Sequence, residues 1–302
     1  MSDTTASLRR KIHSAGDLQS VVRTMKALAA SSIGQYEQSV RALGDYNRAV
    51  ELGLSLCFED TASAASMAGV TRRTDAAAIG AVVFGSDQGL VGQFNDVVAD
   101  HALTMLADLS GESRVWAVGE RVHAHLAEAR STNTGLTLMG RFDVPNAVKA
   151  IIPLVGQILV ESETRRSQGD IGELYLFYNR SMSGAAYAPV SQRLLPLDES
   201  WRRTLAEKPW PTGNLPEVMG GRTTTLRALI REYLFVSLFR ACADSLASEN
   251  ASRLVAMQRA DKNIDELLEA LNGTFRRQRQ SGIDDELFDV IAGFEALVGA
   301  RK

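Results

Sequence analysis

Apolar residues recur every three or four positions at both ends of the chain. From Leu8 to Cys57 the mean spacing is 3.5 residues, and twelve of the fifteen positions are apolar. A repeat of 3.5 rather than 3.6 is typical of helices that wind around each other in a left-handed coiled coil. The same spacing runs from Leu226 to Phe275 and resumes from Ile283 to Leu297. We therefore predict two long helices, the C-terminal one being the longer.

Four positions within these two repeats are polar, namely Gln19, Lys26, Asn47 and Asn250. A polar side chain in an apolar seam lowers stability but favours one alignment of the two helices over all others. We expect these residues to fix the register of the pair.

The middle of the chain has short apolar runs separated by helical patterns. Strands are predicted at Ala76–Phe84, Arg114–Val118, Thr134–Leu138, Leu174–Tyr178 and Val190–Leu197. Helices are predicted at Asn95–Asp108, Glu120–Arg130 and Pro145–Arg166. This alternation is typical of an α/β domain, in which helices cover a mostly parallel sheet.

Proline marks the organisation of the chain, because all seven prolines lie between Pro145 and Pro216. Both ends are therefore free to form uninterrupted helices. We predict a coiled-coil helix at 1–60, an α/β domain at 75–198, a linker at 199–222 and a second coiled-coil helix at 223–302. A compact domain between the helices would bring them together as an antiparallel stalk.

Composition excludes several classes of protein. Hydrophobic residues make up 45% and charged residues 23%, and the formal net charge is −3, which argues against binding to nucleic acid through bulk charge. The two cysteines, Cys57 and Cys242, form no disulfide framework. The N-terminus does not resemble a signal peptide, and no apolar run reaches the roughly 18 residues of a membrane span.

Motifs for catalysis are missing. The loop from Gly85 to Asn95 follows the first predicted strand, but it has neither a GK[ST] ending nor a GxGxxG spacing, so a turn with a helix cap near Asn95 is favoured over a phosphate loop. His123 and His125 lie two apart on a helix and suit the surface better than a metal site. We expect no catalytic residue, cofactor or metal.

Basic residues gather at two places that an antiparallel pair would bring together. The first helix has several near its start, and Asp17 is the one acid among them. We name the basic collar as Arg9, Arg10, Lys11, Arg23, Arg276 and Arg277. A solvated helix face is one interpretation, and contact with an acidic partner is the other, because like charges on a thin rod repel unless acids lie opposite.

Four segments resemble one known family, the γ subunit of F-type ATP synthases. ASENASRLVAMQRADKN resembles the signature ASExxARMxAMxxATxN, and FRRQRQSGIDDELFDVI resembles YNxxRQxxITxELxEIV. LRRKIHSAGDLQSVVRTMKALAASSI resembles the first helix of these subunits, and SDQGLVGQFN resembles the loop SDRGLCGGLN. The segments occur in the family's order and span almost the whole chain.

The sequence also departs from the family pattern. The usual NTxKITxAM is DLQSVVRTM here, and Val91 and Gln93 replace a cysteine and a glycine. These departures suggest a divergent branch, such as the alternate or N-type ATPases that lean toward ATP-driven ion pumping.

The resemblance implies a central rotor shaft that turns inside a ring of alternating α and β subunits and couples ion flow to ATP synthesis or hydrolysis. It implies one copy per complex, contacts with the ε subunit and the membrane ring of c subunits, and ATP, ADP and magnesium bound by the partners. It places the chain peripherally on the cytoplasmic face of a bacterial or archaeal membrane, without a span of its own.

The resemblance also implies roles for particular residues. Residues that match β-subunit contacts of the family are Arg279, Gln280, Met25, Lys26, Gly89, Leu90, Val91 and Gly92. A shaft inside a ring must be thin, and small residues follow the C-terminal helix at Ala247, Ala251, Ala256 and Ala260.

Two other functions stay open on the residues alone. One is a coiled-coil adaptor that tethers unrelated partners, although it would need neither the basic collar nor the pair formed by Arg279 and Gln280. The other is a nucleotide-binding α/β enzyme with helical extensions, which would need a phosphate loop.

Overall fold

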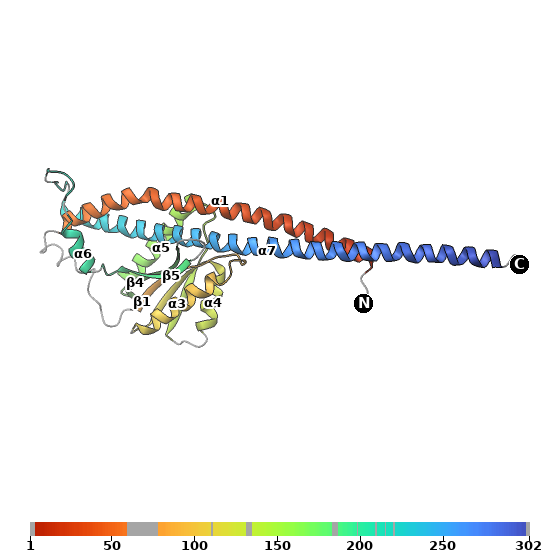
Figure 1. The fold of residues 1–302 in the computed structure, drawn as a ribbon. Helices are drawn as coiled ribbons and strands as arrows, with labels where there is room; N and C mark the ends of the chain where they lie inside the picture. Colours follow the sequence, from red (N-terminus) through yellow and green to blue (C-terminus); the bar gives the residue numbers. More distant parts are fainter. Residues whose placement is uncertain are drawn as a thin grey trace. The chain divides into compact units, whose positions relative to one another are not determined.

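Two long helices begin and end the chain. The computed structural model describes residues 4–58, 78–109, 111–130, 135–182, 187–197, 199–208, 210–214, 216–219 and 221–299. Helix α1 is Thr5–Phe58, with 54 residues, and helix α7 is Arg222–Gly299, with 78 (Figure 1). Both predicted helices are confirmed, and α7 continues through Gly273 and Gly282, because isolated glycines cost only about 1 kcal/mol each in a helix.

The elements between them form an α/β domain. The strands are β1 Ala78–Phe84, β2 Ser113–Val118, β3 Leu136–Phe142, β4 Ile171–Ser181 and β5 Tyr187–Leu195. The helices are α3 Phe94–Asp108, α4 Glu120–Arg130, α5 Val148–Ser167 and α6 Glu199–Ala206. All five strands were predicted, with ends displaced by a few residues. The starts predicted at Ala76 and Thr134 lie outside the described residues.

The sheet has the strand order β3-β2-β1-β4-β5. Strands β1, β2, β3 and β4 run parallel to one another, and β5 runs antiparallel to β4. The predicted mostly parallel sheet is therefore confirmed. Parallel neighbours need a crossover, which α3, α4 and α5 supply, whereas β4 and β5 follow each other directly.

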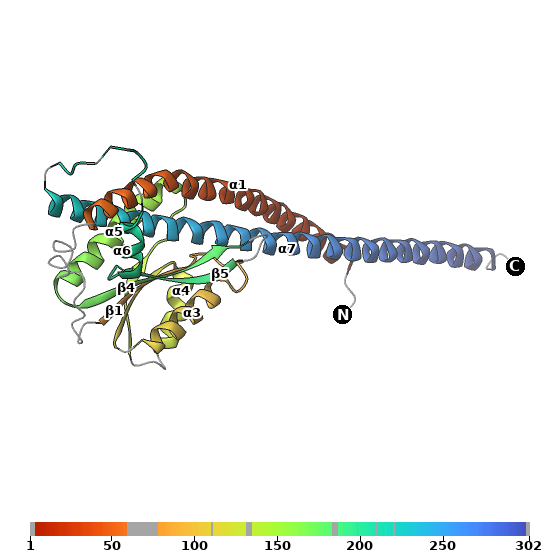
Figure 2. The ribbon, with the colours of Figure 1, turned by 60° about the vertical axis from the view of Figure 1, so that its left-hand side comes forward.

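Alternate residues of β1 face two separate cores, as the two-residue period of a strand requires. Ala81 and Val83 pack with α3 and α4, and Val82 and Phe84 pack with α5 and α7. Every residue of β1 is buried. Figure 2 shows α3 and α4 on the opposite side of the sheet from α7. A continuous apolar run is typical of such a doubly covered strand.

The first half of α7 packs against the sheet as well as against α1. Leu238, Ala241 and Cys242 are at most 1% exposed and lie in the cluster that includes the sheet. None of these three residues belongs to the predicted seam. A single period of 3.5 describes one stripe of a helix, so it cannot reveal a second buried stripe.

The chain divides into two compact units whose limits lie inside the long helices. One consists of residues 29–253 and contains the sheet, and the other consists of residues 1–28 and 254–302. These limits differ from the predicted domain ends at 60, 75 and 223, because parts of both helices pack with the α/β elements. Helix α6 lies within the predicted linker 199–222.

The second unit is a slim pair of helix segments. Its buried residues are Ala15 and Val22 of α1 with Met257 and Ile264 of α7. Small side chains such as Ala256 and Ala260 pack against this cluster, so the helices need little lateral space there. Within the described part of the chain, no helix has the length and apolar character needed to cross a membrane.

We predict that Leu238→Ala destabilises the chain by about 2–5 kcal/mol, because it leaves a cavity between α7 and the sheet. Leu267→Ala is the matched control, since Leu267 is 50% exposed on the same helix. Its effect should stay within about 0.5 kcal/mol. Urea unfolding of the purified chain measures both, and equal effects would contradict a role of α7 in the sheet core.

Candidate partner-contact sites

The loop between β1 and α3 is held by its own polar side chains. The backbone N–H of Ser86 donates to Asn95 Oδ1 at 2.9 Å, and Asn95 Nδ2 donates to Ser86 Oγ at 2.8 Å. Asn95 is thus buried inside the first turn of α3 and closes the loop. The N-cap of α3 is Gln93, near Asn95 as predicted, and its side chain makes no capping hydrogen bond. The amide of Asn95 thus supplies the hydrogen bond that the hydroxyl of Ser86 would otherwise make with water.

Asp87 fastens this loop to two neighbouring segments. Its carboxylate accepts the backbone N–H of Glu120 and that of Val144, both at 2.9 Å. Glu120 begins α4, so the negative charge lies where a helix has unpaired N–H groups and a positive dipole end. The S-D part of the loop motif therefore has a structural role.

The tip of the loop divides into an exposed and a buried part. Leu90 has a φ of 62° and is 61% exposed, whereas Val91 is 2% exposed. The carbonyl of Val91 accepts the hydroxyl of Ser252 on α7 at 2.5 Å. The expected contact set of Gly89, Leu90, Val91 and Gly92 must therefore be corrected, because the side chain of Val91 faces the chain's own interior.

The signature on α7 also faces inward over part of its length. Ser248 is 0% and Glu249 is 5% exposed, and Glu249 accepts Arg253 Nη2 at 2.6 Å. Burial raises the pKa of Glu249, and the positive charge of Arg253 opposes that rise. The explanation of Ala247 by thinness is thus incomplete, because Ala247 packs into the sheet core at 4% exposure.

A polar network crosses the slim helix pair. Lys26 Nζ donates to Asp261 at 2.8 Å, and Arg23 Nε donates to the same carboxylate at 3.1 Å. Gln19 donates to Asp261 and to Asp265. The network joins residues from opposite ends of the sequence, so it specifies one alignment of the antiparallel helices. The expectation that Gln19 and Lys26 fix the register is supported by these bonds.

The other two polar seam residues bond within their own helices. Asn47 donates to Glu51, and Asn250 donates to the carbonyl of Leu246. In the described structure neither bond crosses to the opposite helix.

The basic collar needs one correction. Arg9 lies over the ring of Phe275 at 5.7 Å, which brings residues 9–11 to the level of Arg276 and Arg277. Arg23, however, is paired with Asp261 and Asp265. The acids opposite Arg23 lie in the same chain, so Arg23 is not an open binding charge. Arg276, Arg277, Arg279 and Gln280 are exposed.

Helix α7 continues past the start of α1 with its apolar residues exposed. Arg9, near the beginning of α1, is level with Phe275, and α7 extends from there to Gly299. We name five residues beyond this level the apolar tip. They are 46–70% exposed: Ile283, Leu287, Phe288, Val290 and Ile291. Isolated exposed apolar residues are common, but a group on two successive turns and more marks a contact surface.

His125 illustrates a charged contact that is structural. Its ring lies between Asp96 at 3.2 Å and Asp100 at 3.0 Å, so it ties α4 to α3. Among the described residues, no three His, Cys, Asp or Glu side chains are grouped as a metal site would require.

Comparison with known proteins covers nearly the whole chain. The family model described as ATP synthase matches residues 4–297. The chain belongs to this family. The match includes both long helices and every element between them, so the membership does not rest on one motif.

Curated relatives are named ATP synthase gamma chain. That of Mycolicibacterium paratuberculosis is 25% identical over 100% of both chains, and that of Clavibacter michiganensis is 28% identical over 97% of each. The resemblance to γ subunits is therefore confirmed.

Solved structures share the fold. A chain of the Euglena gracilis mitochondrial ATP synthase, from a structure of OSCP, F1 and c-ring, has a TM-score of 0.65 at 17% identity and covers 99% of this chain and 96% of its own. A chain from the central stalk and c-ring of the Tetrahymena thermophila mitochondrial enzyme has a TM-score of 0.54 at 19% identity, over 80% of this chain and 99% of its own.

Sequence reasoning found some residues of this family member and missed others. It singled out Lys26 and Arg23 but not their partners Asp261 and Asp265, although both acids lie within or beside the quoted signature. It also missed Ser252. A search for acids at one level opposite the basic residues of an antiparallel pair would have found Asp261.

We predict that the pKa of the Asp261 carboxyl lies below its ordinary value, chiefly because Lys26 donates a hydrogen bond to it and further because of Arg23. The pairing then stabilises the helix pair above the ordinary pKa of aspartate, about 3.9, and is lost as pH falls through the lowered value. Carbon-13 NMR titration of Asp261 should show Lys26→Ala raising this pKa. Lys262→Ala is the control, because Lys262 pairs with Glu266, and equal shifts would contradict the assignment.

We predict that Gly119→Ala disrupts the loop of Ser86. A Cβ at Gly119 would lie 2.8 Å from backbone atoms of Ser86, and φ there is 113°. Gly111 has a φ of 133° but open space around a Cβ, so Gly111→Ala isolates the conformational cost. Gly119→Ala should destabilise by about 1–3 kcal/mol more than Gly111→Ala, owing to the clash. Thermal unfolding measures the difference, and equal melting temperatures would exclude a tight contact.

Proposed function

We propose that this chain is the central shaft of a rotary ATP synthase, coupling ion flow across a membrane to ATP synthesis or hydrolysis by turning inside a ring of α and β subunits. The observation that carries this proposal is the apolar tip, which lies on the part of α7 that extends beyond the start of α1. Exposing these side chains to water costs free energy, so we infer that an apolar surface of other chains surrounds them in the assembled complex.

The chemistry of the tip suits a turning contact. Leu287, Phe288 and Val290 offer dispersion and hydrophobic contact, which is not directional. Such a surface keeps similar favourable contacts as it rotates within a smooth sleeve, whereas a set of buried hydrogen bonds would hold one angle. The shaft would act by binding the open and closed states of each β subunit unequally.

Charged contacts would lie at the level of the basic collar. Arg9, Arg10, Arg276 and Arg277 are exposed there, and Arg279 and Gln280 follow on α7. We assign Arg279 and Gln280 to contacts with β subunits, and Leu90 to a further contact from the loop. Exposed guanidinium groups pair well with carboxylates, in a bidentate geometry that favours one orientation.

The remaining roles follow from the family. The chain would be present once per complex, would have no active site of its own, and would leave ATP, ADP and magnesium to its partners. Its α/β domain would contact the ε subunit and the c-ring, and the complex would place it on the cytoplasmic face of the membrane. Its divergence from the γ pattern is compatible with the alternate or N-type branch.

The first test is co-expression of this chain with the α and β subunits of the same genome. We expect a complex with a ring of α and β subunits and one copy of this chain, whose steady ATPase turnover depends on it. If the ring has the same composition and the same ATPase turnover with and without this chain, the proposal is refuted and a coiled-coil adaptor is favoured. Stoichiometry by native mass spectrometry and ATPase assays give these readings.

We predict that Arg279→Glu leaves assembly intact but weakens the coupling of ATP hydrolysis to ion pumping, because it reverses the charge at the β contact. Exposed ion pairs are worth about 1 kcal/mol or less, so the complex should survive. The control is Arg130→Glu, at the end of α4. Pumping and hydrolysis are measured together in vesicles that contain the whole complex, and an unchanged ratio would remove Arg279 from the contact.

A further inference from the structure

Two adjoining cavities lie where α5 meets the sheet and the first half of α7. The first has a volume of about 1020 Å³ and the second about 860 Å³. Leu159, Arg231 and Glu232 line both, so the cavities form one groove within residues 29–253. Each volume falls in the range of ligand sites, roughly 300–1,000 Å³ or slightly above it.

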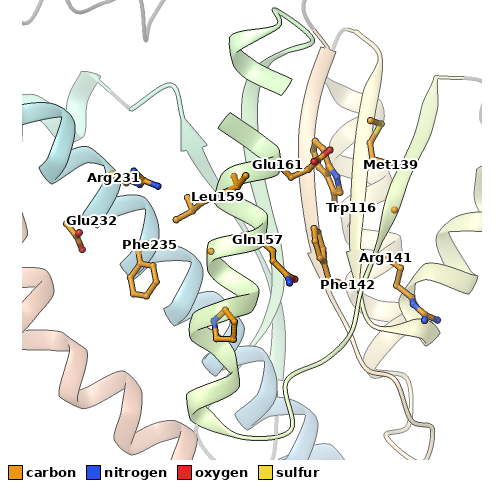
Figure 3. A pocket seen from close by; sticks show the side chains of 14 residues that line it. Trp116, Met139, Arg141, Phe142, Gln157, Leu159, Glu161, Arg231, Glu232 and Phe235 are labelled. Atoms are coloured by element: carbon orange, nitrogen blue, oxygen red, sulfur yellow. The ribbon is translucent and has the colours of Figure 1, made fainter. Parts of the chain in front are cut away.

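The first cavity is mainly apolar. Trp116, Phe142 and Phe235 line it together with Pro153 and Val160. Figure 3 shows Phe235 and Arg231 on α7 to one side of α5, and Trp116 and Phe142 of the strands to its other side. Val160 is 59% exposed, so part of this apolar wall is open to solvent.

The second cavity is lined by three arginines, namely Arg166 of α5 with Arg227 and Arg231 of α7. Arg166 is partly buried, whereas Arg227 and Arg231 are exposed at the mouth of the cavity. Among the described residues none of the three makes an ion pair, unlike the neighbouring Arg165, which pairs with Glu161 and Asp170. The burial of Arg166 lowers its pKa, with Glu163 opposing the change.

Carboxylates line the second cavity too, but they do not neutralise these arginines at close range. Glu173 accepts the hydroxyl of Tyr175 at 3.0 Å, and Glu232 accepts that of Tyr46 at 2.7 Å. Glu163 is exposed on α5. The guanidinium donors therefore remain available, and a guanidinium in a cavity has a geometry that matches the oxygens of a phosphate.

We propose that this groove binds an amphipathic phosphate of the lysophospholipid type, with its phosphate held by Arg166, Arg227 and Arg231 and its apolar chain along Trp116 and Phe235. The apolar cavity and the adjoining cavity with its three arginines outside ion pairs select this class, because a free phosphate leaves the apolar cavity empty and a neutral lipid gives the arginines no charged acceptor. The assignment is independent of the rotor role, since it rests on the α/β unit alone.

Binding is tested with the full chain and lysophosphatidic acid below its critical micelle concentration. Isothermal titration calorimetry should show saturable binding at one site per chain. Replacing the three arginines together, by Arg166→Gln, Arg227→Gln and Arg231→Gln, should weaken affinity roughly tenfold or more, because charge-assisted hydrogen bonds are lost. Arg130→Gln is the control, being an exposed arginine outside the groove.

A second variant tests the apolar half without removing any contact. A side chain at Gly156 would project into open space within the first cavity, with no atom within 4 Å of its Cβ. Gly156→Leu should therefore block the chain-binding half while leaving the fold intact. Gly44→Leu is the matched control, because Gly44 is a helical glycine with equally open surroundings outside the groove.

Four results would overturn the proposal. One is equal affinity of the triple arginine variant and the unaltered chain, which would leave only an adventitious apolar surface. Another is equally tight binding of lysophosphatidylcholine, whose choline masks the phosphate charge. The third is equally tight binding of inorganic phosphate, which would remove the apolar half from the site. Absence of any lysophosphatidic acid binding to the folded chain would likewise refute it.

Discussion

The burial of one face of α7 against the sheet is the constraint on which the rest of the fold depends. Leu238, Ala241 and Cys242 are removed from water there, and about 25 cal/mol per Å² of buried apolar surface favours that arrangement. Within the same unit, Ser252 of α7 donates to the carbonyl of Val91. One helix segment thus completes the sheet core and also positions the β1–α3 loop.

The elements that could be predicted from the sequence are those that leave a regular spacing of apolar residues. A spacing of 3.5 residues was enough to predict both long helices, and strand–helix alternation was enough to predict the mostly parallel sheet. Periodicity could not express the second buried stripe of α7, because one helix can be apolar on two faces for two different neighbours. It also could not assign Asp87, whose carboxylate accepts backbone N–H groups of Glu120 and Val144 that are distant in sequence, or Asn95, whose amide bonds Ser86 across the loop.

The sequence alone did not show which basic residues of α1 are paired within the chain and which are exposed. Counting basic residues along α1 suggested an open cluster that needs an external acid. The acids of α7 meet part of it, since Asp261 alone receives Lys26 and Arg23, while the residues nearer the helix start stay exposed. The distinction depends on the level at which the two antiparallel helices meet, where the cluster around Met257 and Ile264 and the bonds to Asp261 lie together.

The apolar tip of α7 has a consequence for how such a chain is made in the cell. Until other subunits enclose it, Leu287, Phe288 and Val290 remain available to any apolar surface, including the same tip on another copy. A pool of free chains therefore tends toward clumping as its concentration rises. Any chain that covers the tip, whether a partner subunit or a chaperone, would lower this tendency.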